Sequence, residues 1–270
     1  MHPIIFQTNF FTLHSLWLFL GVALLVSTYT LIKLSDKNGL KIQFLSENSL
    51  KIFIWTICIA RITAVITNFS AYFYELSTNT LLQLFYIWDK GLSLWGGVLG
   101  LLIAMFLICK KSTDQNFFKW LDIIIPSIII GLAIIHIGTF FDGIAYGKPT
   151  GLPWGVNFAN PAVKYAVPIH PTQIYAFIYS TIIASGLTLL SQTEKIKAIE
   201  PAGFIGLLGA IAYLFFSFME EFLRGDDTYL LLGIRIPQII IFLLLIAVAV
   251  IFYLRYYHKK IGITHFLTKP

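Results

Sequence analysis

A run of charged side chains closes one of the long apolar stretches of the sequence, in FFSFMEEFLRGDD at 215–227. Within it, Glu221 and Arg224 are three residues apart, a spacing that places both on one face of a helix. A carboxylate in apolar surroundings can exchange a proton, and a guanidinium can bind a phosphate through two parallel hydrogen bonds. The pattern is typical of a site that combines acid–base chemistry with phosphate binding, or of an exposed ion pair at a helix end.

A histidine and a carboxylate lie near the end of a second apolar stretch, in HIGTFFDGIAYGK at 136–148. His136 could act as a general acid or base or as a cationic contact for a lipid, and the alternative is a polar residue that packs between helices. Asp142 follows six residues later. Gly138, Gly143 and Gly147 interrupt the helix and allow close backbone approach or unusual dihedral angles. The segment therefore predicts a pocket where an apolar helix gives way to a glycine-rich loop.

Two further polar groups stand at or within apolar stretches. His170 opens HPTQIYA at 170–176, where Pro171 suits the first turn of a helix and Thr172 and Gln173 add polar groups on that turn. This group is typical of a cap on the helix that begins there. Arg61 lies in the middle of ICIARITAVITNF, where a guanidinium binds a lipid phosphate, forms a structural ion pair or extends toward the nearest polar surface.

The composition indicates what kind of molecule must position these residues. The chain has 270 residues, of which 57% are hydrophobic and 12% charged, and its mean hydropathy is +0.80. Soluble domains carry about 25% charged residues, so this composition excludes an ordinary soluble fold. The net charge of +6 comes from basic residues between the apolar runs, which favours roles in membrane orientation and lipid contact and predicts no nucleic-acid partner. Cys58 and Cys109 lie in apolar runs without a metal-ligand pattern, and we expect both to be buried.

The apolar runs are long enough to cross a bilayer, because a spanning helix needs about 20 residues. In lipid the backbone must satisfy its own hydrogen bonds, which forces these runs to be helical. The sequence thus predicts an all-α membrane protein, residues 1–270 forming a single polytopic domain with about seven transmembrane helices. The expected spans are 12–33, 50–73, 92–109, 119–141, 170–191, 201–222 and 236–254.

Lysine and arginine counts predict the orientation of these spans. Thirteen basic residues fall in one set of alternate loops and the C-terminal tail: Lys33, Lys37, Lys41, Lys51, Lys110, Lys111, Lys119, Lys195, Lys197, Arg255, Lys259, Lys260 and Lys269. The other set holds Lys90, Lys148, Lys164, Arg224 and Arg235. Because cytoplasmic loops carry the excess of positive charge, we expect a cytoplasmic tail at 256–270, an extracytoplasmic N-terminus and an extracytoplasmic loop at 142–169. The polar groups at 136–148, 170–176 and 215–227 then face one outward-opening site.

Four blocks of the chain resemble the bacterial prolipoprotein diacylglyceryl transferases. The blocks are WDKGLSLWGGVLG at 88–100, HIGTFFDGIAYGKPTGLPWGV at 136–156, HPTQIYA at 170–176 and YLFFSFMEEFLRGDD at 213–227. Their order, their spacing and the layout of about seven spans are all similar to that family. The likeness extends over nearly the whole chain.

The resemblance implies an activity and a set of site residues. It implies an enzyme of the bacterial cytoplasmic membrane that moves a diacylglyceryl group from phosphatidylglycerol, or a related phospholipid, to the lipobox cysteine thiol of a preprolipoprotein, with neither a cofactor nor a metal. The implied catalytic residues are His136, Asp142, Glu221 and His170. The implied substrate-binding residues are Arg61, Arg224, Gly96, Gly97, Gly138, Gly143, Gln173 and Tyr175.

The chain departs from the family pattern mainly at charged positions. The family usually has His where this chain has Trp95, Arg at His136, Asn at Thr139, Glu at Ile144 and Arg at Ser217. The retained positions are rich in glycine and proline, which preserve the fold. Three interpretations remain open: a transferase with a rebuilt site, a catalytically silent relative that binds lipid or lipoprotein precursors, and a transporter or unrelated membrane protein.

Overall fold

A computed structural model describes residues 4–8, 12–67, 82, 84, 86, 91–158, 160, 163–193 and 202–267, with side chains up to 256. The chain divides into two compact units. One unit comprises Met1–Leu34 and Phe118–Pro270, and the other comprises Ser35–Phe117.

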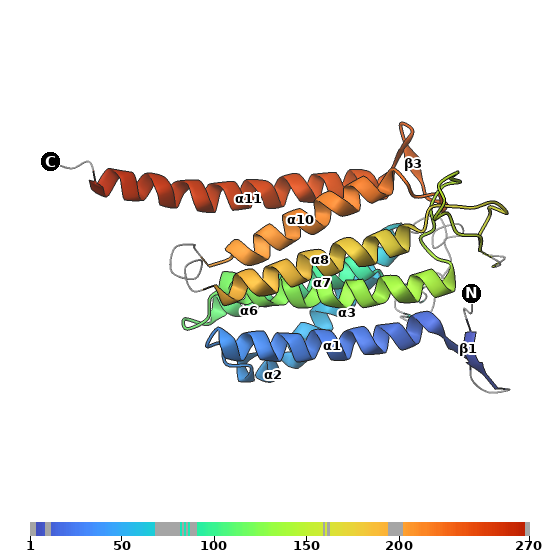
Figure 1. Ribbon diagram of the computed structural model, residues 1–270. Coiled ribbons are helices and arrows are strands. Elements are labelled where there is room, and N and C mark those ends of the chain that lie inside the picture. The colour runs from blue at the N-terminus through green and yellow to red at the C-terminus, as the bar shows by residue number, and fades with distance from the viewer. Residues whose placement is uncertain are drawn as a thin grey trace. The chain divides into compact units, whose positions relative to one another are not determined.

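Seven helices in the described part of the chain are long and apolar enough to cross a membrane, which confirms the predicted number of spans (Figure 1). They are α1 (Ser15–Lys37), α3 (Ser49–Thr67), α6 (Leu94–Lys111), α7 (Phe117–Asp142), α8 (Thr172–Gln192), α10 (Phe204–Glu221) and α11 (Ile236–Leu267). A short helix, α2 (Gln43–Glu47), precedes α3. The predicted end of the second span at 73, part of the 88–100 block and the last residues of the predicted tail lie outside the described residues.

In the first unit, α7 is the central helix. Of its most apolar 18 residues 56% are buried, against 11% in α1 and in α11. Both of its acidic side chains near the helix ends bind the N-terminus of a neighbour. Asp122 accepts hydrogen bonds from the backbone N–H groups of Gly203 and Gly206 at 2.7 and 2.8 Å, where α10 begins. Carboxylates are favourable there because a helix N-terminus presents unpaired N–H groups and positive potential.

In the second unit, α3 and α6 pack through small residues. A Cβ atom added to Gly96 would lie 2.7 Å from Thr63 Cβ, and one added to Gly100 would lie 2.8 Å from the Cα of Thr56. This spacing of two glycines four residues apart is a common close-packing arrangement of membrane helices. Cys109 on α6 is buried as expected, whereas Cys58 on α3 is exposed, so the prediction of two buried cysteines was wrong for Cys58.

The loops at one end of the first unit form a small folded layer, which Figure 1 shows beside the β3 label. The segment 146–150 lies between two others: Gly147 bridges Arg224, and Pro149 bridges Ile169. A small apolar core beneath this layer contains Tyr146, Phe158, Val163 and Ile169. Hairpins complete this end, formed by β1 (Ile4–Gln7) with β2 (Thr12–His14) and by β3 (Leu230–Leu231) with β4 (Ile234–Arg235).

Candidate functional site

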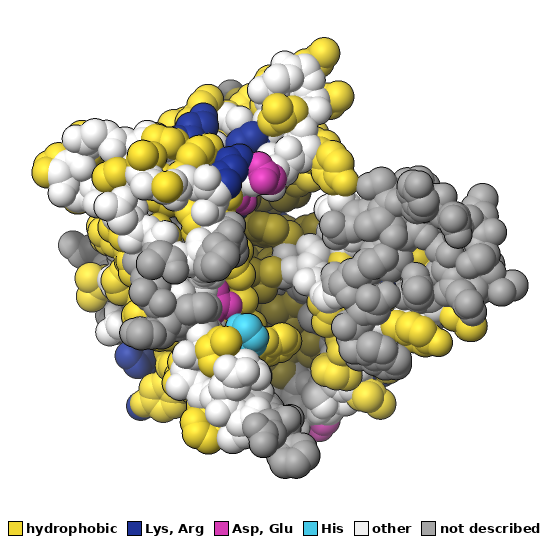
Figure 2. Space-filling model, turned by 90° about the vertical axis from the view of Figure 1, so that its right-hand side faces the viewer, with side chains coloured by type: hydrophobic (Ala, Val, Ile, Leu, Met, Phe, Trp, Pro, Cys, Tyr) yellow, Lys and Arg dark blue, Asp and Glu magenta, His cyan; other side chains and the backbone are white. Residues whose placement is uncertain are grey.

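Charged side chains from the end of α10 and from β4 form one ion network in the first unit. Arg224 binds Asp226 with both arms of its fork, from Nε to Oδ1 at 2.7 Å and from Nη2 to Oδ2 at 2.6 Å. Its third nitrogen, Nη1, lies 3.8 Å from Glu220 and 3.7 Å from Glu221, distances of an ion pair without a hydrogen bond. Figure 2 views the molecule from the right-hand side of Figure 1, the side of the loop layer, and shows basic and acidic side chains next to one another there.

A second arginine completes this ion network. Arg235 donates from Nε to Glu221 Oε2 at 2.8 Å, from Nη2 to Asp226 Oδ1 at 3.0 Å and from Nη1 to the Asp226 carbonyl at 2.7 Å. Burial acts to raise the pKa of Asp226, but the hydrogen bond and charge of Arg224 and the charge of Arg235 outweigh it, so this pKa is lowered. The pKa of Arg224 is raised despite its burial, because Asp226 accepts its hydrogen bond and because Asp226, Glu221 and Glu220 place negative charge beside it.

A line of aromatic hydroxyls connects the network to His136. Tyr179 of α8 donates to Glu220 Oε2 at 2.8 Å. Its ring packs edge-on against Tyr213 of α10, with centroids 5.7 Å apart. The Tyr213 hydroxyl in turn lies 3.3 Å from His136 Nε2 on α7. His136, Glu221 and Arg224, predicted from separate stretches of sequence, therefore belong to one connected group.

The folded loop layer holds Arg224 in place through its backbone. Lys148 N–H donates to the Leu223 carbonyl at 2.8 Å, and Gly225 N–H donates to the Tyr146 carbonyl at 2.9 Å. The neighbouring backbone segments come so close that a Cβ atom on Gly147 would collide with the His170 carbonyl. Glycine is required at position 147 because the segment 146–150 has a backbone segment on each side, which leaves no space for a Cβ atom.

The HPTQIYA segment serves mainly to hold the glycine-rich loop. Thr172 Oγ1 donates to the carbonyl of Ala145 at 2.7 Å, and Gln173 Nε2 donates to that of Ile144 at 2.7 Å. Ala145 has a positive φ of 61°, an unusual conformation for a residue with a Cβ, and the Thr172 hydrogen bond stabilises it. The Gln173 side chain, expected to bind substrate, is 1% exposed and its amide N–H supports the loop.

His170 and Tyr175 form a separate aromatic pair. His170 Nδ1 lies 3.3 Å from the Tyr175 hydroxyl, and Trp154 Nε1 donates to the same hydroxyl at 2.8 Å. Trp154 is exposed, so this group borders the outer surface of the loop layer. The structure thus brings His170 and Tyr175 together, with a tryptophan that the sequence-based residue set did not include.

Asp142 makes contacts other than those expected of a catalytic acid. Its Oδ1 accepts a hydrogen bond from the Ser15 hydroxyl at 2.6 Å and one from the Leu16 backbone N–H at 3.4 Å. Its backbone carbonyl accepts from Asn160 Nδ2 at 2.8 Å. The side chain therefore joins the end of α7 to the start of α1.

Three of the four expected substrate-binding glycines lie at close packing contacts. A Cβ on Gly138 would lie 2.8 Å from Phe19 Cβ, and Gly143 has a positive φ of 71° beside Asn160. In the second unit Gly96 is tightly packed, whereas a Cβ on Gly97 would lie 3.9 Å from Ala60, an ordinary contact. Only Gly97 could accept a small side chain without displacing a neighbour.

Arg61, also in the second unit, binds backbone carbonyls. Its Nε donates to the Leu84 carbonyl and its Nη1 to the Gly91 carbonyl, both at 2.9 Å, and the side chain is buried. These contacts give Arg61 a structural role through backbone carbonyls, which the interpretations of the sequence did not include.

Sequence reasoning missed Arg235, Asp226 and Tyr179 as members of the site. Arg235 is 14 residues from Glu221, a separation that helical spacing does not connect. A signal was present in LLLGIR at 230–235, because a glycine between apolar residues predicts a hairpin that folds the chain back on itself. Asp226 stands in the same charged run as Arg224, two residues away, so its position in the sequence was a signal. Tyr179 carries no such signal, because its role depends on a contact between α8 and α10.

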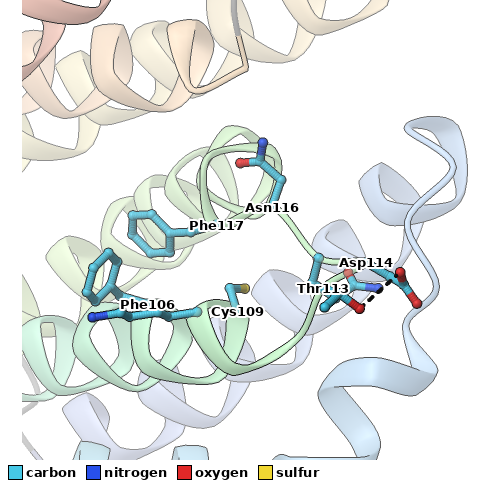
Figure 3. A pocket seen from close by; sticks show the side chains of 8 residues that line it. Phe106, Cys109, Thr113, Asp114, Asn116 and Phe117 are labelled. Atoms are coloured by element: carbon cyan, nitrogen blue, oxygen red, sulfur yellow. Dashed lines mark hydrogen bonds between the residues drawn. The ribbon is translucent and has the colours of Figure 1, made fainter.

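A pocket of about 390 Å³ lies elsewhere, at the connection between α6 and α7 (Figure 3). Phe106, Cys109 and Phe117 supply its apolar wall, and Thr113 and Asp114 its polar one. All of its lining residues belong to the second unit, and none of them is a predicted site residue. Within the described residues, no group of three or more His, Cys, Asp and Glu side chains is arranged to hold a metal ion.

Comparison with known proteins identifies the family. A family model described as "Prolipoprotein diacylglyceryl transferase" matches residues 3–254. A Prochlorococcus marinus (strain MIT 9215) protein named "Phosphatidylglycerol--prolipoprotein diacylglyceryl transferase" is 30% identical over 92% of this chain and 90% of its own length. Proteins of that name from Cupriavidus metallidurans and Clostridium tetani are 34% and 38% identical over 58% and 51% of this chain, and over 56% and 53% of their own lengths. The chain, with its seven membrane helices, therefore belongs to the prolipoprotein diacylglyceryl transferase family.

Proposed function

We propose that this protein transfers a diacylglyceryl group from phosphatidylglycerol, or a related phospholipid, to the lipobox cysteine thiol of a preprolipoprotein. The observation that carries the proposal, beyond family membership, is the ion network in which Arg224 and Arg235 meet three carboxylates at the end of α10. Arginine suits a phosphate ligand because its fork matches two phosphate oxygens.

The reaction needs a cation near the leaving group. The thiolate sulfur forms a bond to the glycerol carbon of the diacylglyceryl group while the bond from that carbon to the phosphate oxygen breaks. The departing glycerol phosphate gains one negative charge as the diester becomes a monoester. Arg224 is suited to bind this phosphate because its Nη1 lies 3.7 Å or more from the two glutamates and can move onto an incoming oxygen.

His136 is our candidate for the base that takes the thiol proton. Of the four side chains expected to be catalytic, Asp142 is bound to α1 and Glu221 is bound to Arg235. His170 pairs with Tyr175 on the loop surface. His136 is linked to the ion network through Tyr213, and a neutral imidazole has a ring nitrogen whose lone pair can accept the thiol proton.

The proposed location is the bacterial cytoplasmic membrane, with the ion network facing the extracytoplasmic side. The support is the excess of basic residues in the loops opposite to this end of the helices. A lipoprotein precursor exported through the membrane would present its lipobox thiol on that side.

Complementation tests the activity directly. The gene is expressed in bacteria depleted of their own transferase, and the mass of a reporter lipoprotein is measured. We expect the mass increase of one diacylglyceryl group. Confirmed membrane expression with an unmodified reporter would contradict the proposal and favour the silent, lipid-binding relative.

Matched variants test the site. Arg224→Ala should reduce transfer by about 100-fold or more, because one preorganised donor contributes roughly 10²–10³ in rate. Lys164→Ala is the control: Lys164 is a cation of the same loop layer, paired with the exposed Asp227 outside the network, and its loss should leave transfer unchanged. Equal activities in both variants would place the phosphate elsewhere.

A further inference from the structure

We propose that Arg235 is a positioning residue that keeps Arg224 available for an anionic phosphate by neutralising Glu221 and Asp226. The inference rests on the proposed function, since it assigns a role within the same site. It also makes a claim about phospholipid binding that can be measured without turnover.

The first support is the set of partners of Arg235. Its side chain is 13% exposed, and all three of its nitrogens donate within the network, to Glu221, to the Asp226 carboxylate and to the Asp226 carbonyl. Arg235 is thus fully engaged with protein groups. It is arranged to act on phosphate through Arg224 rather than by direct contact.

The second support is the charge balance around Arg224. Glu220, Glu221 and Asp226 face two guanidinium groups in the intact network. Without Arg235, one arginine would face all three carboxylates, and Glu221 would lose its 2.8 Å partner. The freed carboxylate would draw in Arg224 Nη1, and the added negative charge would repel a phosphate.

The third support is the hairpin that sets the position of Arg235. Leu230 pairs with Arg235 and Leu231 pairs with Ile234, so the connection contains two residues, Leu232 and Gly233. Both have positive φ, 52° and 79°. Such a turn reverses the chain sharply and matches the twist of the two strands. It returns Arg235 to the end of α10, from which the hairpin departs.

Lipid binding by the purified full-length protein provides the test. Native mass spectrometry compares retention of phosphatidylglycerol with that of diacylglycerol, which lacks the phosphate. Arg235→Ala should weaken phosphatidylglycerol binding by about tenfold or more, as expected for an unbalanced charge close to the ligand, and leave diacylglycerol binding unchanged. Arg235→Lys, which keeps the charge, should recover part of the loss. Lys164→Ala is again the control cation.

A relocated guanidinium sharpens the test. Ser217 is one helical turn before Glu221 on α10, so an arginine there could reach Glu221. Ser217→Arg combined with Arg235→Ala should restore phosphatidylglycerol binding at least partly. If this double variant does not fold, Asp226→Asn combined with Arg235→Ala tests the same charge balance by removing one carboxylate. Thermal unfolding verifies that each compared protein is folded.

The outcomes separate this inference from the proposed function. Loss of phosphatidylglycerol binding alone in folded Arg235→Ala, with partial recovery in Arg235→Lys, supports the role even if the wild-type protein transfers no lipid. Unchanged phosphatidylglycerol binding in Arg235→Ala overturns it, even if the wild-type protein is an active transferase. Equal losses for both lipids also overturn it, because they would indicate a general structural effect.

Discussion

At the scale of single residues, the ion network distinguishes groups suited to chemistry from groups that hold the fold. Arg224 retains one nitrogen at ion-pair distance from two carboxylates, whereas every nitrogen of Arg235 is hydrogen bonded. Asp142 was expected at the site, yet its side chain binds the start of α1. Contacts, more than residue type, therefore indicate which charged groups can meet a substrate.

The lowered pKa of Asp226 predicts an acid-sensitive contribution to stability. Because its folded-state pKa lies below the ordinary value of 3.8, its ion pairs stabilise the protein above that pH and lose their effect as the pH falls through the lowered pKa. Asp226→Asn should reduce the free energy of unfolding by about 1–3 kcal/mol near neutral pH. Thermal unfolding in detergent at several pH values should show the difference from wild type shrinking in acid, and a constant difference would contradict this account.

His136 and Asp142 should respond differently to substitution. His136→Ala should abolish diacylglyceryl transfer with little change in thermal stability, because it removes the proposed base. Asp142→Ala should retain transfer per folded molecule but lose about 1 kcal/mol of stability with the contacts to α1. Transfer assays normalised to folded protein provide the comparison. The opposite pattern would return Asp142 to the catalytic group.

Whether a contact of the site can be predicted from the sequence depends on how far apart its two residues lie along the chain. The spacing of Glu221 and Arg224 lies within one helical turn, so a short motif was sufficient to pair them. Tyr179 meets Glu220 across two helices, and Arg235 reaches Glu221 by way of a hairpin. Such contacts depend on tertiary packing, which local spacing does not encode.

At the scale of the helices, the length and apolar composition of a run predict that a helix is present more accurately than they predict its first and last residues. All seven spans were predicted from runs of sufficient length. The sixth was expected at 201–222 but extends from Phe204 to Glu221, because Asp122 of α7 binds the backbone N–H groups of Gly203 and Gly206 and thereby sets its start. A cap supplied by another helix cannot be recognised in the sequence of the capped one.

The contact between α3 and α6 predicts a difference between two adjacent glycines. Gly96→Ala should lower the free energy of unfolding by about 1–3 kcal/mol, since its new methyl group would lie 2.9 Å from the Cα of Ala60. Gly97→Ala adds the same methyl at 3.9 Å from Ala60 and should be tolerated. Thermal unfolding of both variants tests packing, and equal stability with a selective loss of lipid binding in Gly96→Ala would favour a substrate role instead.

At the scale of the whole molecule, the seven candidate spans among the described residues predict that the two chain ends lie on opposite sides of the membrane, because seven is an odd number. From the excess of basic residues in the opposite loops, we expect the loop layer to lie on the extracytoplasmic side. Gly151 lies in that layer with open space around it, and Asp114 lies in the connection between α6 and α7. Under the proposed orientation, these two positions should report on opposite sides of the membrane.

Cysteine labelling tests this orientation. Gly151→Cys and Asp114→Cys are each introduced into a chain whose Cys58 and Cys109 are replaced by serine. A membrane-impermeant maleimide should label the first in intact cells and the second only after the membrane is permeabilised. Reversed labelling would place the ion network on the cytoplasmic side and remove the proposed access of exported precursors.

The hydrogen bonds of segment 146–150 would hold the protein together if its chain were cut after this segment. Lys148 bonds to Leu223, Thr150 bonds to Pro168, and Gly147 bonds to His170. The two segments that pair with 146–150, one near 168–170 and one near 223–225, both follow Gly151 in the sequence. A protein cut at Gly151 would keep these bonds between its two fragments. Co-expressed halves should accordingly copurify and rebuild the ion network, whose charged members all belong to the C-terminal half.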